Sequence, residues 1–365
     1  MEASDNIWDE WTWCMERMRS DDRIPGMALA MIKNHTQPRI KCFGVRDSRS
    51  NQPVTPHTLF HIASTQKSMT ALYIATLIDE GRFSWDTPVS ELAPQFRLHD
   101  ENATRTVSMR HLLGMSGGIP AAAQDGFDTQ GRHAEDLFEY MPNVRLNARP
   151  GENFDYSNLS CAAAGYCGVI ADGGIFGQLE DEFAREMKQR IFDPIGMAGA
   201  TFSADETRAS GDYSISHKKG FLYGSSVADE VIAQPDPLSP AGGVRATITD
   251  MARYLAVQLN GGVTPEGNRV VSEANLRETW TPQTQTDGGG YAMGWGIEQE
   301  GDMTVVFHEG SFAGYLALLA MVPQYGTGIA LLTNMDNDDG FAGAALSEWI
   351  PLLQGEAHRS GEQYD

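Results

Sequence analysis

A serine and a lysine three residues apart lie at the start of a stretch with helical periodicity. After Ser64 and Lys67, apolar residues recur at three- and four-residue steps up to Gly81, which predicts a helix with both side chains on one face of its first turn. We expect the Ser64 hydroxyl to cap this helix and Gly81 to end it. A serine beside an amine at a positive helix end has the parts of an activated nucleophile.

The same spacing occurs a second time in the chain, so it does not identify a nucleophile by itself. Ser216-His217-Lys218-Lys219 also fits S-x-x-K, but it lies between two glycines with no helical pattern after it, which predicts a loop. On spacing alone, the simpler interpretation is that Ser64 is a helix cap and Lys67 is a surface lysine. A catalytic role therefore requires partners elsewhere in the chain.

Two short motifs supply candidate partners. Tyr156-Ser157-Asn158 is the only Y-x-N of the chain and precedes a predicted helix, so its phenol and amide can project from a loop into a cleft. His308-Glu309-Gly310 is the only H-x-G, ends a predicted strand and is followed by Ser311. Taken singly, each has a structural interpretation: a packed tyrosine ring with a helix-capping asparagine, and a strand residue before a turn.

A rival nucleophile is Ser116, because Gly114-Met115-Ser116-Gly117-Gly118 fits the G-x-S-x-G elbow. That elbow needs a strand before the serine and a helix after it. Here the preceding residues are predicted to be helical, and Ile119-Pro120 follows. The chain also lacks alternating strand and helix units. We therefore assign these glycines to a turn.

Composition narrows the classes of partner. The 365 residues are 41% hydrophobic and 21% charged, which is typical of a globular protein, and the net charge is −22. This charge argues against nucleic acid and against an anionic membrane surface as partners. The first residues lack a basic segment followed by a long apolar run, and no apolar stretch is long enough to cross a bilayer. We expect a cytoplasmic protein without membrane insertion.

The chain offers no pattern for a metal or cofactor. It has neither H-E-x-x-H nor C-x-x-C, and no phosphate- or dinucleotide-binding glycine motif, so we predict none. We interpret several histidines as surface or core residues rather than ligands: His57, His61, His99, His111 and His133. We expect the cysteines to be reduced and buried: Cys14, Cys42, Cys161 and Cys167.

The periodicity predicts helices at the two ends and in the middle of the chain, with strands near each end. Predicted helices, besides that of Ser64, cover residues 7–18, 86–92, 109–115, 134–141, 158–171, 179–191, 250–259 and 341–353, with a short one after Ser272. Predicted strands cover residues 27–33, 39–45, 291–299, 303–308, 315–322 and 328–333. We expect Ser108 and Thr249 to cap helices and Asp193-Pro194 to end one.

This order predicts a mixed α/β (α+β) fold with one antiparallel sheet built from both ends of the chain. Residues 1–63 and 285–365 would form the sub-domain with the sheet and the terminal helices. Residues 64–284 would form a mainly helical sub-domain on the other face. Ser64 would lie at the floor of the cleft between the two.

The three motifs in this order resemble those of the serine β-lactamase and penicillin-binding protein superfamily. The resemblance is strongest to the branch with class C β-lactamases, D-aminopeptidases, DD-carboxypeptidases and family VIII carboxylesterases. It covers nearly the whole chain and includes residues 60–67, 107–120, 150–158, 240–250 and Gly294-Trp295-Gly296. It implies the β-lactamase-like fold.

The resemblance also implies a role for each motif residue. Ser64 would form an acyl-enzyme, and Lys67 and Tyr156 would share the proton transfers, either of them being the base. A neighbouring ammonium would lower the pKa of the Tyr156 phenol. Asn158 would hold Lys67 or a substrate carbonyl. The backbone N–H groups of Ser64 and Ser311 would form the oxyanion hole.

The third motif departs from the β-lactamase pattern. Class C β-lactamases carry K-T-G where this chain has His308-Glu309-Gly310, and a histidine with a pKa near 6.5 is mostly neutral at pH 7. An obligatory anionic β-lactam is therefore disfavoured, and esters, amides or D-amino-acid peptides are favoured. His308 and Gly310 would border the substrate, whereas Glu309 should point the other way along an extended strand.

The resulting hypothesis is a cofactor-free serine hydrolase that acts on a small-molecule acyl substrate, an ester, amide or thioester. A carboxylesterase is the first choice. A D-specific peptidase, DD-carboxypeptidase or weak β-lactamase is the alternative within the class. An acyltransferase or thioesterase of a biosynthetic pathway is a third possibility, and a non-catalytic binding protein on the same fold is a fourth. The sequence leaves the oligomeric state open.

Overall fold

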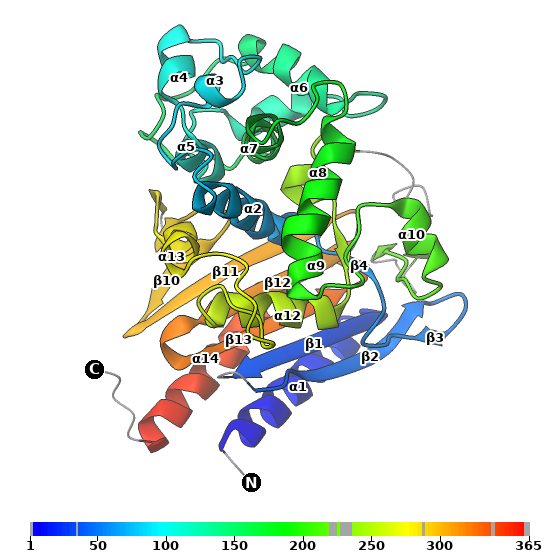
Figure 1. Cartoon of the computed structure of the whole chain (residues 1–365). Coiled ribbons are helices and arrows are strands. Elements are labelled where there is room, and N and C mark those ends of the chain that lie inside the picture. The colour runs from blue at the N-terminus through cyan, green and yellow to red at the C-terminus, as the bar shows by residue number, and fades with distance from the viewer. Residues whose placement is uncertain are drawn as a thin grey trace.

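A central sheet with helices on both faces organises the chain. The computed structural model describes residues 3–33, 36–218, 225–226, 236–286, 289–336 and 340–360. The two terminal helices lie against one face of the sheet, and most of the other helices lie on the opposite side (Figure 1). Lys219 of the second S-x-x-K segment lies outside the described residues.

The sheet joins the two ends of the chain. Among the described residues, nine strands form one antiparallel sheet in the order β3-β2-β1-β13-β12-β11-β10-β9-β8. The N-terminal strand β1 pairs with the C-terminal strand β13, with Met27 opposite Thr333 and Lys33 opposite Thr327. The predicted sheet and the mixed α/β class are therefore confirmed. The strands of the sheet are β1 (Gly26–Lys33), β2 (Arg39–Asp47), β3 (Gln52–Pro53), β8 (Thr284–Thr286), β9 (Gly289–Tyr291), β10 (Gly296–Glu300), β11 (Met303–Phe312), β12 (Tyr315–Val322) and β13 (Thr327–Thr333).

Short strands and helices complete the fold. Strand β4 (Phe60–His61) pairs with β7 (Arg245–Ala246), and β5 (His217–Lys218) pairs with β6 (Ser225–Ser226). The helices are α1 (Ala3–Asp21), α2 (Lys67–Asp79), α3 (Val89–Leu92), α4 (Glu101–Thr106), α5 (Met109–Leu113), α6 (Ala134–Tyr140), α7 (Asn158–Ala171), α8 (Leu179–Met187), α9 (Asp193–Ile195), α10 (Ala204–Ala209), α11 (Ser239–Gly242), α12 (Ile248–Leu259), α13 (Glu273–Trp280) and α14 (Phe341–Ser360). Short 3₁₀ segments lie at Ala63–Gln66, Ala121–Gly126, Met141–Asn143 and Pro323–Tyr325, and Lys188–Phe192 is π-helical. None of the helices in these described parts is both long and apolar enough to cross a membrane.

The sheet separates two apolar cores. Helices α1 and α14 bury Trp11, Met15 and Trp349 against the outer face of the sheet, where the Trp11 indole donates a hydrogen bond to the Ala345 carbonyl at 3.1 Å. Helices α2, α7 and α12 bury a larger set on the inner face. The cysteines are unpaired thiols, all buried except the partly buried Cys42. The division into two sub-domains stays a prediction.

Three predicted boundaries are wrong for local reasons. The strand predicted at 291–299 is two strands, because Gly294 (φ +76°) turns the chain back between β9 and β10. The cap of α12 is Thr247 rather than Thr249: the hydroxyl of Thr247 accepts the Asp250 N–H at 3.0 Å. Pro194 does not end the helical run, because proline fits the first turn of α9.

The turn that carries Ser64 also differs from the prediction. Ser64 lies in the 3₁₀ turn Ala63–Gln66 that leads into α2, and its side chain caps neither this turn nor the helix. Helix α2 ends at Asp79, and Gly81 follows with φ +73°, as predicted. The Ser64 hydroxyl therefore makes no capping hydrogen bond to the backbone and is available to another side chain.

Two glycines let other segments approach this turn closely. A Cβ on Gly310 of β11 would lie 2.5 Å from the Ile62 carbonyl oxygen and 2.9 Å from the Ser64 nitrogen. A Cβ on Gly294 would lie 2.5 Å from the Lys67 carbonyl carbon. Real Cβ atoms do not approach backbone this closely, so both positions require glycine. The backbone of β11 thus lies directly against the Ser64 turn.

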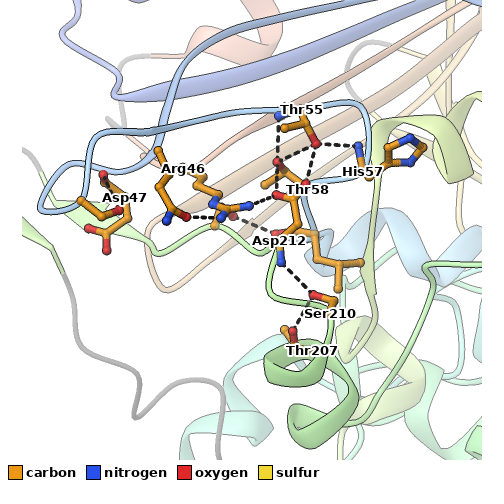
Figure 2. Close-up of polar contacts among 12 residues, drawn as sticks. Arg46, Asp47, Thr55, His57, Thr58, Thr207, Ser210 and Asp212 are labelled. Atoms are coloured by element: carbon orange, nitrogen blue, oxygen red, sulfur yellow. Dashed lines mark hydrogen bonds and ion pairs between the residues drawn. The ribbon is translucent and has the colours of Figure 1, made fainter.

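A polar cluster anchors the segment that leads into this turn. The Asp212 carboxylate accepts hydrogen bonds from the hydroxyls of Thr55, at 2.5 Å, and Thr58, at 2.6 Å, and it pairs with the Arg46 guanidinium (Figure 2). Its backbone carbonyl accepts the Leu59 N–H at 2.9 Å. These contacts fix the chain just before β4 and hence before Ser64.

We predict that Gly310→Ala destabilises the protein by about 1–3 kcal/mol, because the added methyl group would overlap the backbone of the Ser64 turn. Urea unfolding measures the change. Gly343→Ala in α14 is the matched control: a Cβ on Gly343 would have no atom of the described residues within 4 Å, so alanine should stabilise by about 0.5–1 kcal/mol. Equal stability of Gly310→Ala and the parent would contradict this packing.

We also predict that Asp212→Asn costs about 1–2 kcal/mol of unfolding free energy, because a charged acceptor of several hydrogen bonds is lost. The control is Asp205→Asn. Its side chain is 97% exposed and pairs only at the surface with Arg208, so the change should be about 0.5 kcal/mol or less. If both variants unfold at the same urea concentration as the parent, Asp212 is not an anchor.

Candidate active site

The side chains of Ser64 and Lys67 meet at the start of α2. The Lys67 ammonium nitrogen lies 2.8 Å from the Ser64 hydroxyl oxygen and donates a second hydrogen bond, at 2.7 Å, to the Ala241 carbonyl of α11. Lys67 is fully buried. The interpretation of Lys67 as a surface lysine is therefore wrong, and the S-x-x-K spacing does place both groups on one face.

Burial tunes the basicity of Lys67. It lowers the pKa of the amine to about 8, against a small opposing effect of Cys161. No carboxylate among the described residues pairs with Lys67 to counter this effect of burial. About one amine in ten is then neutral at pH 7 and about half at pH 8. A neutral amine in hydrogen-bond contact with a serine hydroxyl can accept its proton.

Tyr156 lies close to both Ser64 and Lys67. Its ring centroid is 4.9 Å from the Lys67 ammonium nitrogen. Burial raises the pKa of the phenol, and the influence of the Ser64 side chain offsets this only in part. The expectation that the pKa of Tyr156 is lowered is therefore wrong for the free protein: removal from water outweighs the opposing effect of Ser64.

Asn158 begins α7 two residues after Tyr156. Its amide nitrogen donates to the Gln124 side-chain oxygen at 2.7 Å, and its own amide oxygen is buried without a hydrogen-bond partner among the described residues. The helix is capped by Ser157 instead, whose hydroxyl accepts the Ser160 N–H. A contact of Asn158 with Lys67 or with a substrate carbonyl stays a prediction. The unsatisfied oxygen can accept a hydrogen bond from the Lys67 ammonium, whereas a substrate carbonyl would have to accept from the amide nitrogen that bonds Gln124.

His308 of β11 is held by hydrogen bonds on both ring nitrogens. The Nδ1 atom lies 2.5 Å from the Glu309 carbonyl, which can only accept, so Nδ1 carries the proton. Nε2 then accepts the Tyr291 hydroxyl at 3.0 Å. Burial and the nearby Lys67 charge lower the pKa of His308 to about 3. The ring is neutral throughout the ordinary pH range, as the sequence led us to expect at pH 7.

Tyr291 is a site residue that the sequence did not reveal. Its ring lies edge-on to Tyr156, with centroids 6.1 Å apart, and packs on Phe154 at 5.2 Å. Its hydroxyl fixes His308. It fell inside one long predicted strand and belongs to no motif, so only the turn between β9 and β10 places it here. The rings of Tyr156, Tyr291 and His308 thus pack on one another.

A pocket of about 460 Å³ opens beside Ser64. Strands β9, β10 and β11 supply most of its lining, and the loop before α7 supplies Tyr156. The lining residues are Ser64, Tyr156, Thr286, Gly290, Tyr291, Gly296, Ile297, Glu298, Phe307, His308, Glu309, Ser311 and Leu316. A space of this size accommodates a small acyl compound.

Two glutamates, Glu298 and Glu309, border the pocket. Glu309 is exposed where His308 is buried, as strand alternation predicts, but both side chains border the pocket. Burial and the charges of Glu298 and Asp336 raise the pKa of the Glu309 carboxyl. None of the described residues that line the pocket is a lysine or an arginine.

Gly310 and Ser311 follow along β11. The Ser311 side chain borders the pocket, and its hydroxyl donates to the Asp336 carboxylate. Strand β10 pairs with β11 only from Met303 to Phe307, so the described structure gives residues 308–312 no strand partner on that edge. The edge that passes Ser64 is therefore open to the pocket, as an oxyanion site requires.

The rival serines lie elsewhere. Ser116 is buried in the turn after α5, next to Met115 with φ +56°, and the element directly before it is this helix rather than a strand. Ser216 is also buried, and the strand β5 follows it rather than a helix. Neither borders the pocket at Ser64.

Known proteins resemble this chain over most of its length. It is 27% identical over 344 residues to unguisins hydrolase ungD' of Aspergillus campestris, which covers 88% of this chain. It is 23% identical over 335 residues to protein flp of Staphylococcus aureus, which covers 90% of this chain. The chain spans 61% of the length of each of these relatives.

Solved structures share the fold. An octameric penicillin-binding protein homologue from Pyrococcus abyssi superposes with a TM-score of 0.78 at 25% identity, covering 95% of this chain and 77% of that one. A class C beta-lactamase superposes with a TM-score of 0.79 at 18% identity, covering 95% and 96%. The profile of the beta-lactamase family matches residues 13–348. The chain therefore belongs to the beta-lactamase family and has the fold of its serine hydrolases.

Proposed function

We propose that this protein is a carboxylesterase that acts through an acyl-enzyme on Ser64. The observation that carries the proposal is the 2.8 Å contact between the Ser64 hydroxyl and the buried Lys67 amine, beside a pocket of about 460 Å³. A serine hydroxyl is a weak nucleophile until a neighbouring base accepts its proton. Membership of the family and the similarity to a hydrolase support the same chemistry.

Lys67 is the general base of this proposal. Its pKa of about 8 leaves a useful fraction of neutral amine, whereas burial raises the pKa of Tyr156 and disfavours phenolate. The amine accepts the Ser64 proton while the hydroxyl oxygen attacks the ester carbonyl. When the tetrahedral intermediate collapses, the C–O bond breaks, and the leaving alkoxide takes a proton from the Tyr156 hydroxyl, which Lys67 replenishes.

Water completes the cycle. It attacks the acyl carbonyl, gives a proton to the same base and releases the acid, and the Ser64 oxygen regains its proton. The backbone N–H groups of Ser64 and Ser311 would stabilise the oxyanion in both steps, at about 3–4 kcal/mol per donor in measured hydrolases. The close approach that Gly310 permits supports this assignment, because it brings β11 to the nitrogen of Ser64.

Charge around the pocket argues for uncharged or cationic substrates. His308 is neutral, and Glu298 and Glu309 border the pocket without a basic neighbour among its described lining. A substrate carboxylate would meet no cation there besides Lys67 and would be repelled by both glutamates. This favours esters over anionic β-lactams.

A second candidate is a D-specific peptidase. The same two carboxylates favour it, because they can attract the free ammonium group of an amino-acid amide. The chemistry at Ser64 would be identical, with an amine as leaving group in place of an alcohol. The two candidates therefore differ only in which acyl compound turns over fastest.

The base assignment predicts the pH dependence. Only the neutral amine accepts a proton, so kcat/KM for an ester should rise with pH and level off above an apparent pKa near 8. Tyr156→Phe should lower the plateau by about 100-fold or more and leave this pKa in place. A pH profile that is flat from 6 to 9, or a pKa that vanishes in Tyr156→Phe, would assign the base to another group.

The substrate class is tested by one panel of p-nitrophenyl acyl esters, D-alanyl amides and nitrocefin. We expect the esters to be hydrolysed fastest, D-alanyl amides more slowly, and the anionic nitrocefin slowest. Ser64→Ala should abolish turnover of all of them. Ser116→Ala is the matched control and should keep it, because Ser116 lies outside the pocket. If nitrocefin alone turned over efficiently, the charge argument would be wrong.

A further inference from the structure

The residue before Ser64 has an unusual backbone conformation. Ala63 has φ +46°, in the left-handed region that residues other than glycine rarely adopt. Such a conformation persists only where the surrounding structure holds it. Ala63 is buried and begins the 3₁₀ turn that carries Ser64, so whatever holds Ala63 also sets the direction of the nucleophile.

The side chain of His61 supplies a hydrogen bond at this point. Its Nδ1 atom accepts the Ala63 N–H at 3.1 Å, and both residues are buried. The imidazole is itself fixed, because its ring centroid lies 4.9 Å from that of Phe312 and 6.1 Å from that of Tyr315. Phe312 is the last residue of β11 and Tyr315 is the first residue of β12. The hydrogen bond from Ala63 to His61 therefore links the Ser64 turn to the sheet.

The acceptor is present over the whole working pH range. Nδ1 accepts a hydrogen bond only when it carries no proton. Burial, helped by the charge of Arg245, lowers the pKa of His61 to about 3. Without this acceptor, the Ala63 N–H would be a buried donor that has lost its partner, in a conformation that alanine avoids.

We propose that His61 is a positioning residue: by accepting the Ala63 N–H it holds the left-handed turn that aims the Ser64 hydroxyl at Lys67. The inference rests on the proposed function, since it concerns the same nucleophile. The alternative is a core histidine that contributes packing and stability only. The two roles predict different effects on kcat: loss of the acceptor atom slows turnover only if His61 positions Ser64.

The test separates the acceptor from the shape of the side chain. Asparagine and leucine have nearly the same shape, and only the asparagine oxygen can replace Nδ1, at the same distance along the side chain. We expect His61→Asn to keep kcat within about 3-fold and His61→Leu to lower it by about 10- to 100-fold at unchanged KM, because a small displacement of a reacting group has effects of this size. His61→Phe keeps an aromatic ring and should behave like His61→Leu.

Rescue through the backbone is the second arm. Glycine adopts positive φ without strain. Adding Ala63→Gly to His61→Leu should therefore restore kcat by about tenfold, although it replaces no contact of the imidazole. Three outcomes would each show that His61 contributes packing only. They are an equal loss of kcat in His61→Asn and His61→Leu, a wild-type kcat in His61→Leu, and no recovery of kcat in the double variant.

Labelling with a fluorophosphonate tests this inference separately from the proposed function, because the reagent reacts with Ser64 whatever the natural substrate is. The rate of Ser64 labelling by a fluorophosphonate should fall in His61→Leu as kcat does, in protein shown by its thermal transition to be folded. If the wild-type protein is not labelled, the proposed function fails. If wild type and His61→Leu are labelled at the same rate, only the role of His61 fails.

Discussion

Strand β11 and the turn that carries Ser64 are in backbone contact, and the geometry of the site depends on it. Gly310 makes the contact possible, because any side chain there would overlap Ile62 or Ser64. Gly294 allows the β9–β10 turn to approach Lys67 in the same way. Trp295, the residue after Gly294, stacks on Tyr254, and the Tyr254 hydroxyl donates a hydrogen bond to the Ser68 side chain. A nucleophile placed by backbone packing has little freedom to move away from the open edge of β11.

The same enclosure sets the electrostatics. Because Lys67 is buried without a carboxylate partner among the described residues, its amine loses its proton far more easily than a surface lysine. Because Tyr156 and His308 are buried too, the phenol keeps its proton and the imidazole stays neutral. One physical cause, removal from water, therefore divides the roles: an amine that can accept, a phenol that can donate, and a ring that only shapes the pocket.

The sequence pattern predicted the regular helices and strands of the chain. Helix α7 and strand β12 have the predicted bounds, since each is one uninterrupted and mostly apolar segment. The sequence pattern missed features that depend on the backbone angles of a single residue. An example is the turn at Gly294, which divides the predicted strand into β9 and β10 and brings Tyr291 to the pocket. The motifs singled out Ser64, Lys67 and Tyr156, and the structure brings these three side chains together. They gave the wrong direction for the pKa of Tyr156, because the depth of burial is a property of the folded chain.

Covalent labelling is the sharpest test of the proposal that Ser64 is the residue that becomes acylated. The protein would be treated with a fluorophosphonate, digested, and the modified peptide identified by mass spectrometry. We expect a single adduct on Ser64 and none in Ser64→Ala. An adduct on Ser116 or Ser216, or no adduct under conditions that label a control esterase, would contradict the proposal.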